Sequence, residues 1–470
     1  MSPSVTVLPG GLRVCVESVP QYGRGLAAVA LTVAAGGDDD PAGRHGTAHL
    51  VEHLMFPRSG REGSADPAGE GYAALVAGAG GVCNAETHRD HTVFHTTVPA
   101  ELLPDALAWE AGRLLGFAPT EDVIRTETDV IGEEIRGAGD AGRYWESALG
   151  ALYPGSRDSF GTAAELAGIT AGEVGAFFRA HYTAPRMVLS VVGDVDPARV
   201  VAVVREVFAG VVRTAEETRA AEAPRTARET RAAEAPRTAE EARVAGAVRT
   251  AEETRAAEAP RTARETRAAE APRAATEIRT APLPAARPGV AVGHPLPDPV
   301  ADRPAYLAQA VLAQVLGRSR LPALARSARD GHRLTSATVT CGYHGQWLAS
   351  AAPDLTLAVL GRAPGTEVGA AVDIWRSVLR AVADGPLPEA EHRRAVNCLL
   401  VAWHRQADSL PTRAVALGRD ALLLPGSAGP DALPAELRRT TPAEVAAAAR
   451  ALLEGPVTVT ELAPQKGTVG

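Results

Sequence analysis

Lysine is almost absent from this chain. The sequence holds 48 lysines and arginines against 56 aspartates and glutamates, a formal net charge of −8, and Lys466 is the only lysine. An acidic chain without a basic stripe argues against nucleic-acid binding as its main task.

Long apolar runs and closely spaced cysteines are also lacking. No stretch approaches the roughly 20 apolar residues of a membrane span, and residues 1–11 lack the basic-then-apolar pattern of a secretory signal. Cys15, Cys83, Cys341 and Cys398 show no CxxC spacing, which favours free thiols over a disulfide framework or cysteine-bound zinc. We therefore expect a cytoplasmic protein without a membrane segment.

A low-complexity block interrupts the sequence. From Arg213 to about Pro284 a twelve-residue unit of the type RTAEETRAAEAP repeats, with almost nothing apolar besides alanine and a proline closing most units. A solenoid repeat needs one buried hydrophobic face per unit, and these units have none. We interpret residues 210–288 as an exposed, partly helical or disordered linker, with a partner-docking arm as the alternative.

Two regions with globular composition flank this linker, at residues 1–209 and 289–470. Both mix strand-like alternation with helical periodicity, which predicts two α+β halves, each a mostly antiparallel sheet covered by helices. We expect strands at 12–18, 27–34, 187–192, 335–342 and 355–360, and a β segment at 82–97. We expect helices at 47–56, 100–115, 120–136, 171–181, 305–316, 368–383, 389–409 and 442–453.

One helix carries a metal-binding pattern. His49 and His53 are four residues apart, so on a helix their imidazoles point from one face toward the same ion. Glu52 is close enough to reach a metal-bound water without being a ligand, and HxxEH reverses the HExxH order of zinc peptidases. Zinc lowers the pKa of its bound water toward about 7, and a carboxylate then accepts the remaining proton.

A second helix offers the third protein ligand that catalytic zinc needs. Glu127 and Glu134 are seven residues apart and share a helical face, whereas Glu133 is turned about 100° away. We assign Glu134 as the ligand and Glu127 as a carboxylate that orients a histidine or the water. One Zn²⁺ per chain is therefore expected.

Chance must be weighed against this interpretation. With twelve histidines, an HxxEH arises by coincidence in roughly one such sequence in forty, and acidic pairs on helices are usually solvated. The motif and the acidic helix together favour a metal site. His88, His91 and His95 form another cluster, but on one strand His88 points away from the other two, so we expect structural or substrate-lining roles.

Several motifs in order resemble one family. They are GGLRV at 10–14, AAGGDDDPAGRHGTAHLVEHLMF at 34–56, NAET at 84–87, ETDVIGEEIR at 127–136, GTAAELAGIT at 161–170 and HYTAPRMVLSVVGDVD at 181–196. The first half is similar along nearly its whole length to the M16 metallopeptidases (insulinase, pitrilysin, mitochondrial processing peptidase). This resemblance implies zinc binding by His49, His53 and Glu134, with Glu52 as general base and Glu127 as support.

The resemblance also implies how a peptide substrate binds. In the family the peptide adds a strand to a sheet edge, here Asn84, Ala85, Glu86 and Thr87, so that main-chain hydrogen bonds supply affinity. Glu86 stands where relatives often have an apolar residue. We hypothesise that Glu86 favours a basic side chain beside the cut bond, with an exposed acidic strand residue as the alternative.

The second half is a weaker match. The family carries there an arginine and, seven residues later, a tyrosine that contacts the substrate and the oxyanion. Arg326 and Arg329 are the candidate arginines, but Arg333 and Ser336 follow them at that spacing, and Tyr343 fits the pattern poorly. The missing tyrosine suggests a heterodimer in which a partner supplies the Arg/Tyr pair, with a homodimer less favoured.

The resulting hypothesis is the zinc-bearing subunit of an endopeptidase. Removal of leader peptides and clearance of peptide fragments are both compatible with it. The alternatives are a non-catalytic peptide binder or scaffold of the same family, and a docking role centred on the repeats.

Overall fold

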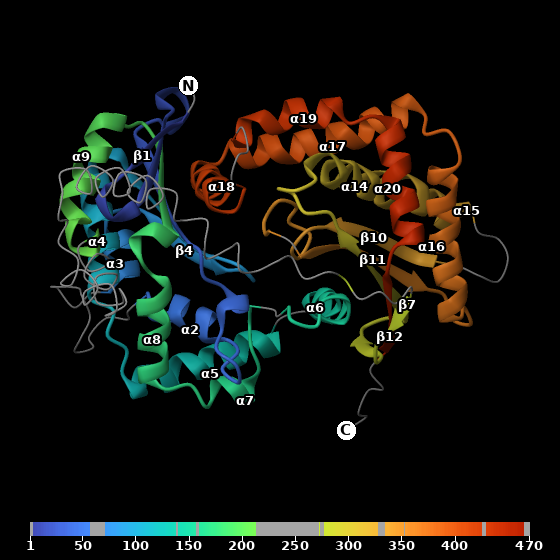
Figure 1. The fold of residues 1–470 in the computed structure, drawn as a ribbon, viewed down its shortest axis with the longest axis horizontal. Coiled ribbons are helices and arrows are strands. Elements are labelled where there is room, and N and C mark those ends of the chain that lie inside the picture. The colour runs from blue at the N-terminus through green and yellow to red at the C-terminus, as the bar shows by residue number, and fades with distance from the viewer. Residues whose placement is uncertain are drawn as a thin grey trace, which may run out of the picture.

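The computed structural model describes residues 3–56, 71–137, 140–156, 159–212, 272, 277–327, 334–351, 353–424 and 429–464. These residues form two α+β halves that face each other (Figure 1). The prediction for the repeats falls almost entirely outside the described residues. None of the described helices is both long and apolar enough to cross a membrane.

The first half is built on a six-stranded sheet. Its strands run in the order β1-β2-β6-β3-β5-β4, and only the β2–β6 pair is parallel. In that order they span Ser4–Val7, Arg13–Ser18, Met187–Gly193, Leu26–Val33, Thr92–Pro99 and Val82–Thr87. Among the described strands, β4 therefore lies at the edge of the sheet, where its outer backbone groups can pair with another strand.

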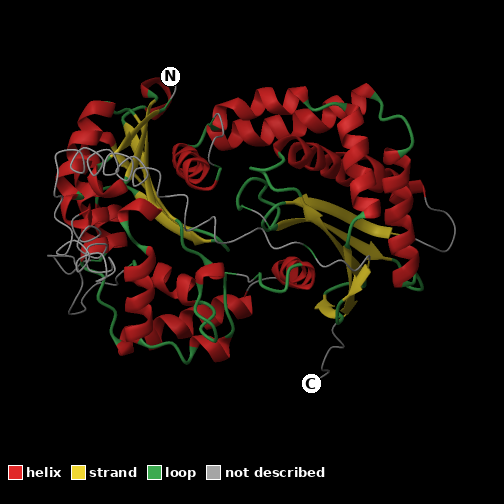
Figure 2. Ribbon diagram, viewed as in Figure 1, coloured by secondary structure: helices red, strands yellow, loops and turns green. Residues whose placement is uncertain are grey.

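Helices of the first half cover this sheet or pack on the helices that cover it (Figure 2). They are α1 (Pro20–Gly23), α2 (Thr47–Leu54), α3 (Tyr72–Gly78), α4 (Leu103–Leu115), α5 (Glu121–Gly137), α7 (Ala163–Leu166), α8 (Ala171–His181) and α9 (Pro197–Val207). Buried apolar residues of α2, such as Leu50 and Val51, share one core with Leu31 and Phe94 of the strands and Ile131 of α5. This core fixes α2 beside α5.

The second half repeats the plan. Its strands run β10-β11-β9-β12-β7, with β8 also pairing with β12, and only the pairs of β12 with β7 and β8 are parallel. They span Leu334–Cys341, Asp354–Arg362, Gly289–Leu296, Val457–Pro464, Glu277–Arg279 and Leu283–Ala285. The covering helices are α14 (Arg303–Val315), α15 (Leu321–Ser327), α16 (Val368–Ala383), α17 (Glu389–Ala407), α19 (Leu433–Arg439) and α20 (Pro442–Glu454).

One helix of each half packs on the sheet of the other half. Helix α6 (Asp140–Leu152) packs Trp145 and Leu149 on the second sheet. Helix α18 (Leu410–Leu423) packs on the first sheet, where a Cβ at Gly418 would lie 2.4 Å from the Thr32 hydroxyl. This exchange holds the halves together across their interface.

The predicted fold class is confirmed, because both sheets are mostly antiparallel and covered by helices. Strands β7 and β8 fall within residues 210–288, which the sequence assigned to the linker. The domain boundaries themselves stay a prediction.

Candidate metal centre

The helix with the HxxEH pattern is capped by a residue outside it. Both carboxylate oxygens of buried Asp40 accept backbone N–H groups at the start of α2, from Gly46 and Ala48, each at 2.7 Å. Gly46 has φ +98°, and a Cβ there would lie 2.6 Å from Leu166. A left-handed, tightly packed position of this kind favours glycine. Together these two residues fix where α2 begins.

The three predicted metal ligands converge. Oε2 of Glu134 lies 3.6 Å from Nε2 of His49 and 3.5 Å from Nε2 of His53. One ligand atom from each residue can be chosen so that all lie within 4.8 Å of one another. A tetrahedral zinc ion with ligands at about 2.1 Å requires ligand atoms about 3.4 Å apart. The donor set fits a zinc ion, and both distances from Glu134 lie near this value.

Glu127 contacts one of these ligands, His53, without belonging to the ligand group. It is buried, and its Oε2 lies 3.4 Å from Nδ1 of His53, the ring nitrogen turned away from Glu134. A carboxylate on the second nitrogen of a metal-binding imidazole fixes its orientation. Because Glu127 and Glu134 both project from α5 toward α2, the shared helical face predicted from their spacing is present.

Glu52 lies beside the ligand group without joining it. Its Oε2 accepts a 2.5 Å hydrogen bond from the Thr87 hydroxyl at the end of β4. Burial raises the pKa of Glu52, only partly offset by Thr87 and His53. A half-buried carboxylate whose pKa is raised in this way suits a general base.

A cavity of about 810 Å³ opens onto these side chains. Its lining from the first half consists of His49, Glu52, His53, Phe56, Ala73, Cys83, Asn84, Ala85, Glu86, Thr87, His88, Glu127, Glu134, Ser159 and Phe160. Phe160 packs edge-on against His49 at a ring separation of 5.5 Å. The lining holds four glutamates and, within the part of the chain that the structure describes, neither lysine nor arginine. The cavity is therefore acidic.

The predicted substrate edge borders this cavity. Asn84, Ala85, Glu86 and Thr87 form the last four residues of β4, and all four line the cavity. These residues pair with β5 on one side of β4, and the other side has no partner strand in the described sheet. The position suits strand addition by a peptide, although substrate binding by these residues stays a prediction.

The strand geometry expected around His88 was wrong, whereas the structural or substrate-lining role expected for it stays a prediction. The segment 82–97 is a hairpin rather than one strand, and His88 and His91 lie in its turn, where their rings stack at 4.4 Å. Backbone pairing of His88 N–H with His91 C=O, at 2.8 Å, closes that turn. Of the three histidines, only His88 lines the cavity.

The second half contributes cavity residues that the sequence pattern did not predict. Tyr343, His344 and Gln346 line it from the turn after β10, and the Tyr343 hydroxyl lies 2.6 Å from Ser159 Oγ. Tyr343 fits no arginine–tyrosine spacing, so only the docking of the two halves reveals its place. The side chain of Arg326 and the whole of Arg329 lie outside the described residues.

Comparison with known proteins places this geometry in a family. Residues 16–138 match the family model "Insulinase (Peptidase family M16)", and residues 168–399 match "Peptidase M16 inactive domain". An uncharacterized zinc protease of Mycobacterium bovis is 32% identical over 213 residues, 44% of this chain and 47% of that protein. A probable mitochondrial-processing peptidase subunit beta of Arabidopsis thaliana is 30% identical over 43% of this chain and 38% of its own length. These matches span less than half of either curated relative.

Solved structures resemble the whole fold. A protease from Helicobacter pylori has a TM-score of 0.73 at 17% identity, covering 98% of this chain and 99% of its own. A putative M16-like peptidase from Alicyclobacillus acidocaldarius has a TM-score of 0.67 at 16% identity, covering 99% and 98%. At such identities the likeness concerns the fold alone. The two family models together cover most of the chain, and they show that it belongs to peptidase family M16, the insulinase family.

Proposed function

We propose that this chain is the zinc-dependent subunit of an endopeptidase that hydrolyses unstructured peptides. The observation that carries the proposal is the convergence of His49, His53 and Glu134 at spacings suited to tetrahedral zinc. The free strand edge and Glu52 border the same cavity.

Each site residue has a task in this proposal. His49, His53 and Glu134 would hold the ion, and Glu127 would keep the His53 ring in position. A bound zinc ion polarises a carbonyl and lowers the pKa of water toward about 7. Glu52 accepts a proton from the attacking water and returns it to the leaving amine, while the Thr87 hydroxyl holds its carboxylate in place.

The edge strand and the charge of the cavity suggest the substrate. A peptide that pairs with Asn84–Thr87 is held by main-chain hydrogen bonds, so its sequence is read only by local pockets. A divalent ion balances two of the four lining glutamates, which leaves the cavity negative. This balance supports the hypothesis that Glu86 favours a basic side chain near the cut bond.

A partner subunit remains part of the proposal. The arginine–tyrosine pair expected in the second half is missing at its usual spacing, and some relatives are named as subunits. Tyr343 and His344, however, already bring second-half side chains to the cavity. A heterodimer therefore predicts zinc binding by the isolated chain but poor cleavage until an M16-like partner is added.

The test is cleavage of an unstructured peptide by the purified chain, with and without zinc, and with and without the partner. We expect zinc-dependent cleavage that His49→Ala abolishes and that rises when the partner is added. Full activity of the chain alone would refute the need for a partner. Absence of cleavage under every condition would favour a second candidate, a non-catalytic peptide binder.

One observation favours that candidate. The family model matched over residues 168–399 is described as an inactive domain. Against it stands the first half, where all five predicted metal-site residues are present and assembled around one cavity. A peptide binder of this kind would bind without cutting.

A further inference from the structure

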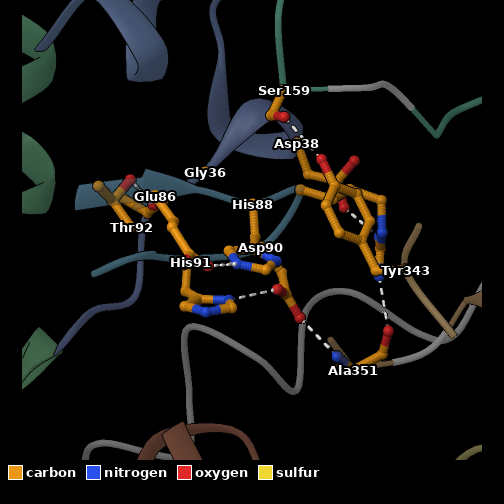
Figure 3. Close-up of polar contacts among 12 residues, drawn as sticks. Gly36, Asp38, Glu86, His88, Asp90, His91, Thr92, Ser159, Tyr343 and Ala351 are labelled. Atoms are coloured by element: carbon orange, nitrogen blue, oxygen red, sulfur yellow. Dashed lines mark hydrogen bonds and ion pairs between the residues drawn. The ribbon is translucent and has the colours of Figure 1, made fainter. Parts of the chain in front are cut away.

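Glu86 has a fixed neighbour inside the cavity. Its Oε2 lies 3.1 Å from Nε2 of His88. Figure 3 marks this contact with a dashed line. The two side chains differ in exposure: that of Glu86 is 46% exposed and that of His88 only 3%. The carboxylate is thus accessible to a ligand, whereas the imidazole is enclosed.

The His88 ring is clamped on both sides. It stacks on His91 at 4.4 Å with the ring planes 15° apart, and Tyr343 of the second half packs against it at 4.9 Å. His91 is held in turn by Asp90, which lies 2.9 Å from His91 Nδ1 and accepts the N–H of Ala351 at 2.6 Å. This chain of contacts leaves His88 little freedom to turn (Figure 3).

The contacts also select the tautomer of His88. Nε2 faces the carboxylate and must donate, whereas Nδ1 is buried and has no hydrogen-bond partner among the described residues. The Nε2 proton is therefore shared with the Glu86 carboxylate, which accepts it.

The hydrogen bond acts on Glu86 in two ways. It lowers the pKa of that carboxyl group against the opposing effect of burial, which keeps the group ionised. It also restrains a half-exposed side chain that otherwise samples several rotamers. Ordering such a side chain on binding costs about 0.5–1.5 kcal/mol. Here the side chain is already ordered in the free protein, so binding does not carry that cost.

We propose that His88 is a positioning residue that aims Glu86 into the cavity, so that the two form a subsite for a lysine or arginine side chain of the bound peptide. The subsite rests on the proposed peptide-binding function. It is assembled from both halves, because Tyr343, anchored by its hydroxyl to Ser159, forms one wall of the His88 position.

The experiment compares two peptides that differ only in one arginine or leucine near the expected cut. Their dissociation constants are measured by fluorescence anisotropy on the zinc-loaded Glu52→Gln chain, which should bind without cutting. Cleavage by the zinc-loaded chain with Glu52 intact is assayed separately. With the M16-like partner added, we expect that chain to cut both peptides. We expect the Glu52→Gln chain to bind the arginine peptide more tightly than the leucine peptide.

Two substitutions at His88 separate its hydrogen bond from its packing. His88→Phe keeps a ring in the stack but removes the donor, and we expect it to lower the preference for arginine by about three- to tenfold. His88→Gln keeps an N–H donor of similar reach and should restore most of the preference. In a Glu86→Gln background, His88→Phe should change nothing, because the group it positions is gone.

The outcomes are distinct. Three results would each overturn the positioning role. They are equal binding of the two peptides, an unchanged ratio of their dissociation constants in His88→Phe, and the same loss of preference when Glu86 is already replaced. A merely structural role of His88 would weaken both peptides alike and would not be rescued by Gln. Lack of cleavage even with the partner added, together with the expected binding pattern, would instead remove the peptidase function and leave the subsite standing.

Discussion

Asp40 caps the start of the metal-binding helix, although it lies nine residues before His49 in the sequence. Its two oxygens accept the N–H groups of Gly46 and Ala48, and Oδ2 also lies 3.0 Å from Nδ1 of His45. The first N–H groups of a helix have no partners within it, so this carboxylate satisfies donors that would otherwise be buried without acceptors.

Asp40→Asn should therefore destabilise the first half. An amide has one acceptor oxygen instead of two, and it turns an NH₂ group toward backbone N–H donors. We expect a loss of about 1–2 kcal/mol in the free energy of unfolding, measured by urea titration. Asp408→Asn, at an exposed position after α17, is the matched control and should change stability little. Equal effects of the two substitutions would show that the capping contacts do not matter.

At this scale the sequence predicted what spacing alone determines. His49 and His53 share a face because they are four residues apart, and Glu127 and Glu134 because they are seven apart. The hydrogen bond from Thr87 to Glu52 and the contact of His88 with Glu86 could not be predicted. They depend on how the β4–β5 hairpin turns and on where it lies against α2.

At the scale of elements, several helices were located closely. The ranges expected at 171–181 and 368–383 coincide with α8 and α16, and that expected at 442–453 ends one residue short of α20. Apolar periodicity marks such helices whatever they pack against. The same signal cannot say which sheet a helix covers, so the exchange of α6 and α18 between the halves was not predicted.

A buried histidine on β9 links this packing to pH. Nε2 of His294 accepts a 3.0 Å hydrogen bond from Nε1 of Trp375 on α16, and burial lowers the pKa of His294 from 6.5 to about 3. Below pH 6.5 the unfolded chain binds a proton there that the folded chain does not bind until about pH 3. The folded state therefore loses stability as the pH falls through this window, by about 1.4 kcal/mol per pH unit.

The variant His294→Gln keeps an acceptor for Trp375 but does not titrate. Between pH 6 and pH 4 we expect its unfolding free energy to fall less steeply than that of the parent chain. The two slopes should differ by about 1.4 kcal/mol per pH unit. Urea titrations at several pH values give both slopes. Parallel profiles of the two proteins would mean that His294 is not the neutral, buried group that the structure indicates.

At the scale of the whole molecule, the cavity belongs to both halves. The metal ligands, Glu52 and the strand edge come from the first half, whereas Tyr343, His344 and Gln346 come from the second. Arg89, buried in the β4–β5 turn, pairs with Asp38 and donates to the Ala351 carbonyl at 2.7 Å. Sequence motifs describe each half separately, so the contribution of Tyr343 emerged only from the docked arrangement.

The central claim is that His49, His53 and Glu134 form one zinc site and that Glu52 serves it without holding the ion. Equilibrium zinc titration of chelator-stripped chains tests this most directly. We predict one tightly bound zinc per chain, retained in Glu52→Gln and lost in His49→Ala and Glu134→Ala. Tight zinc binding that survives His49→Ala, or that disappears in a folded Glu52→Gln chain, would contradict the account.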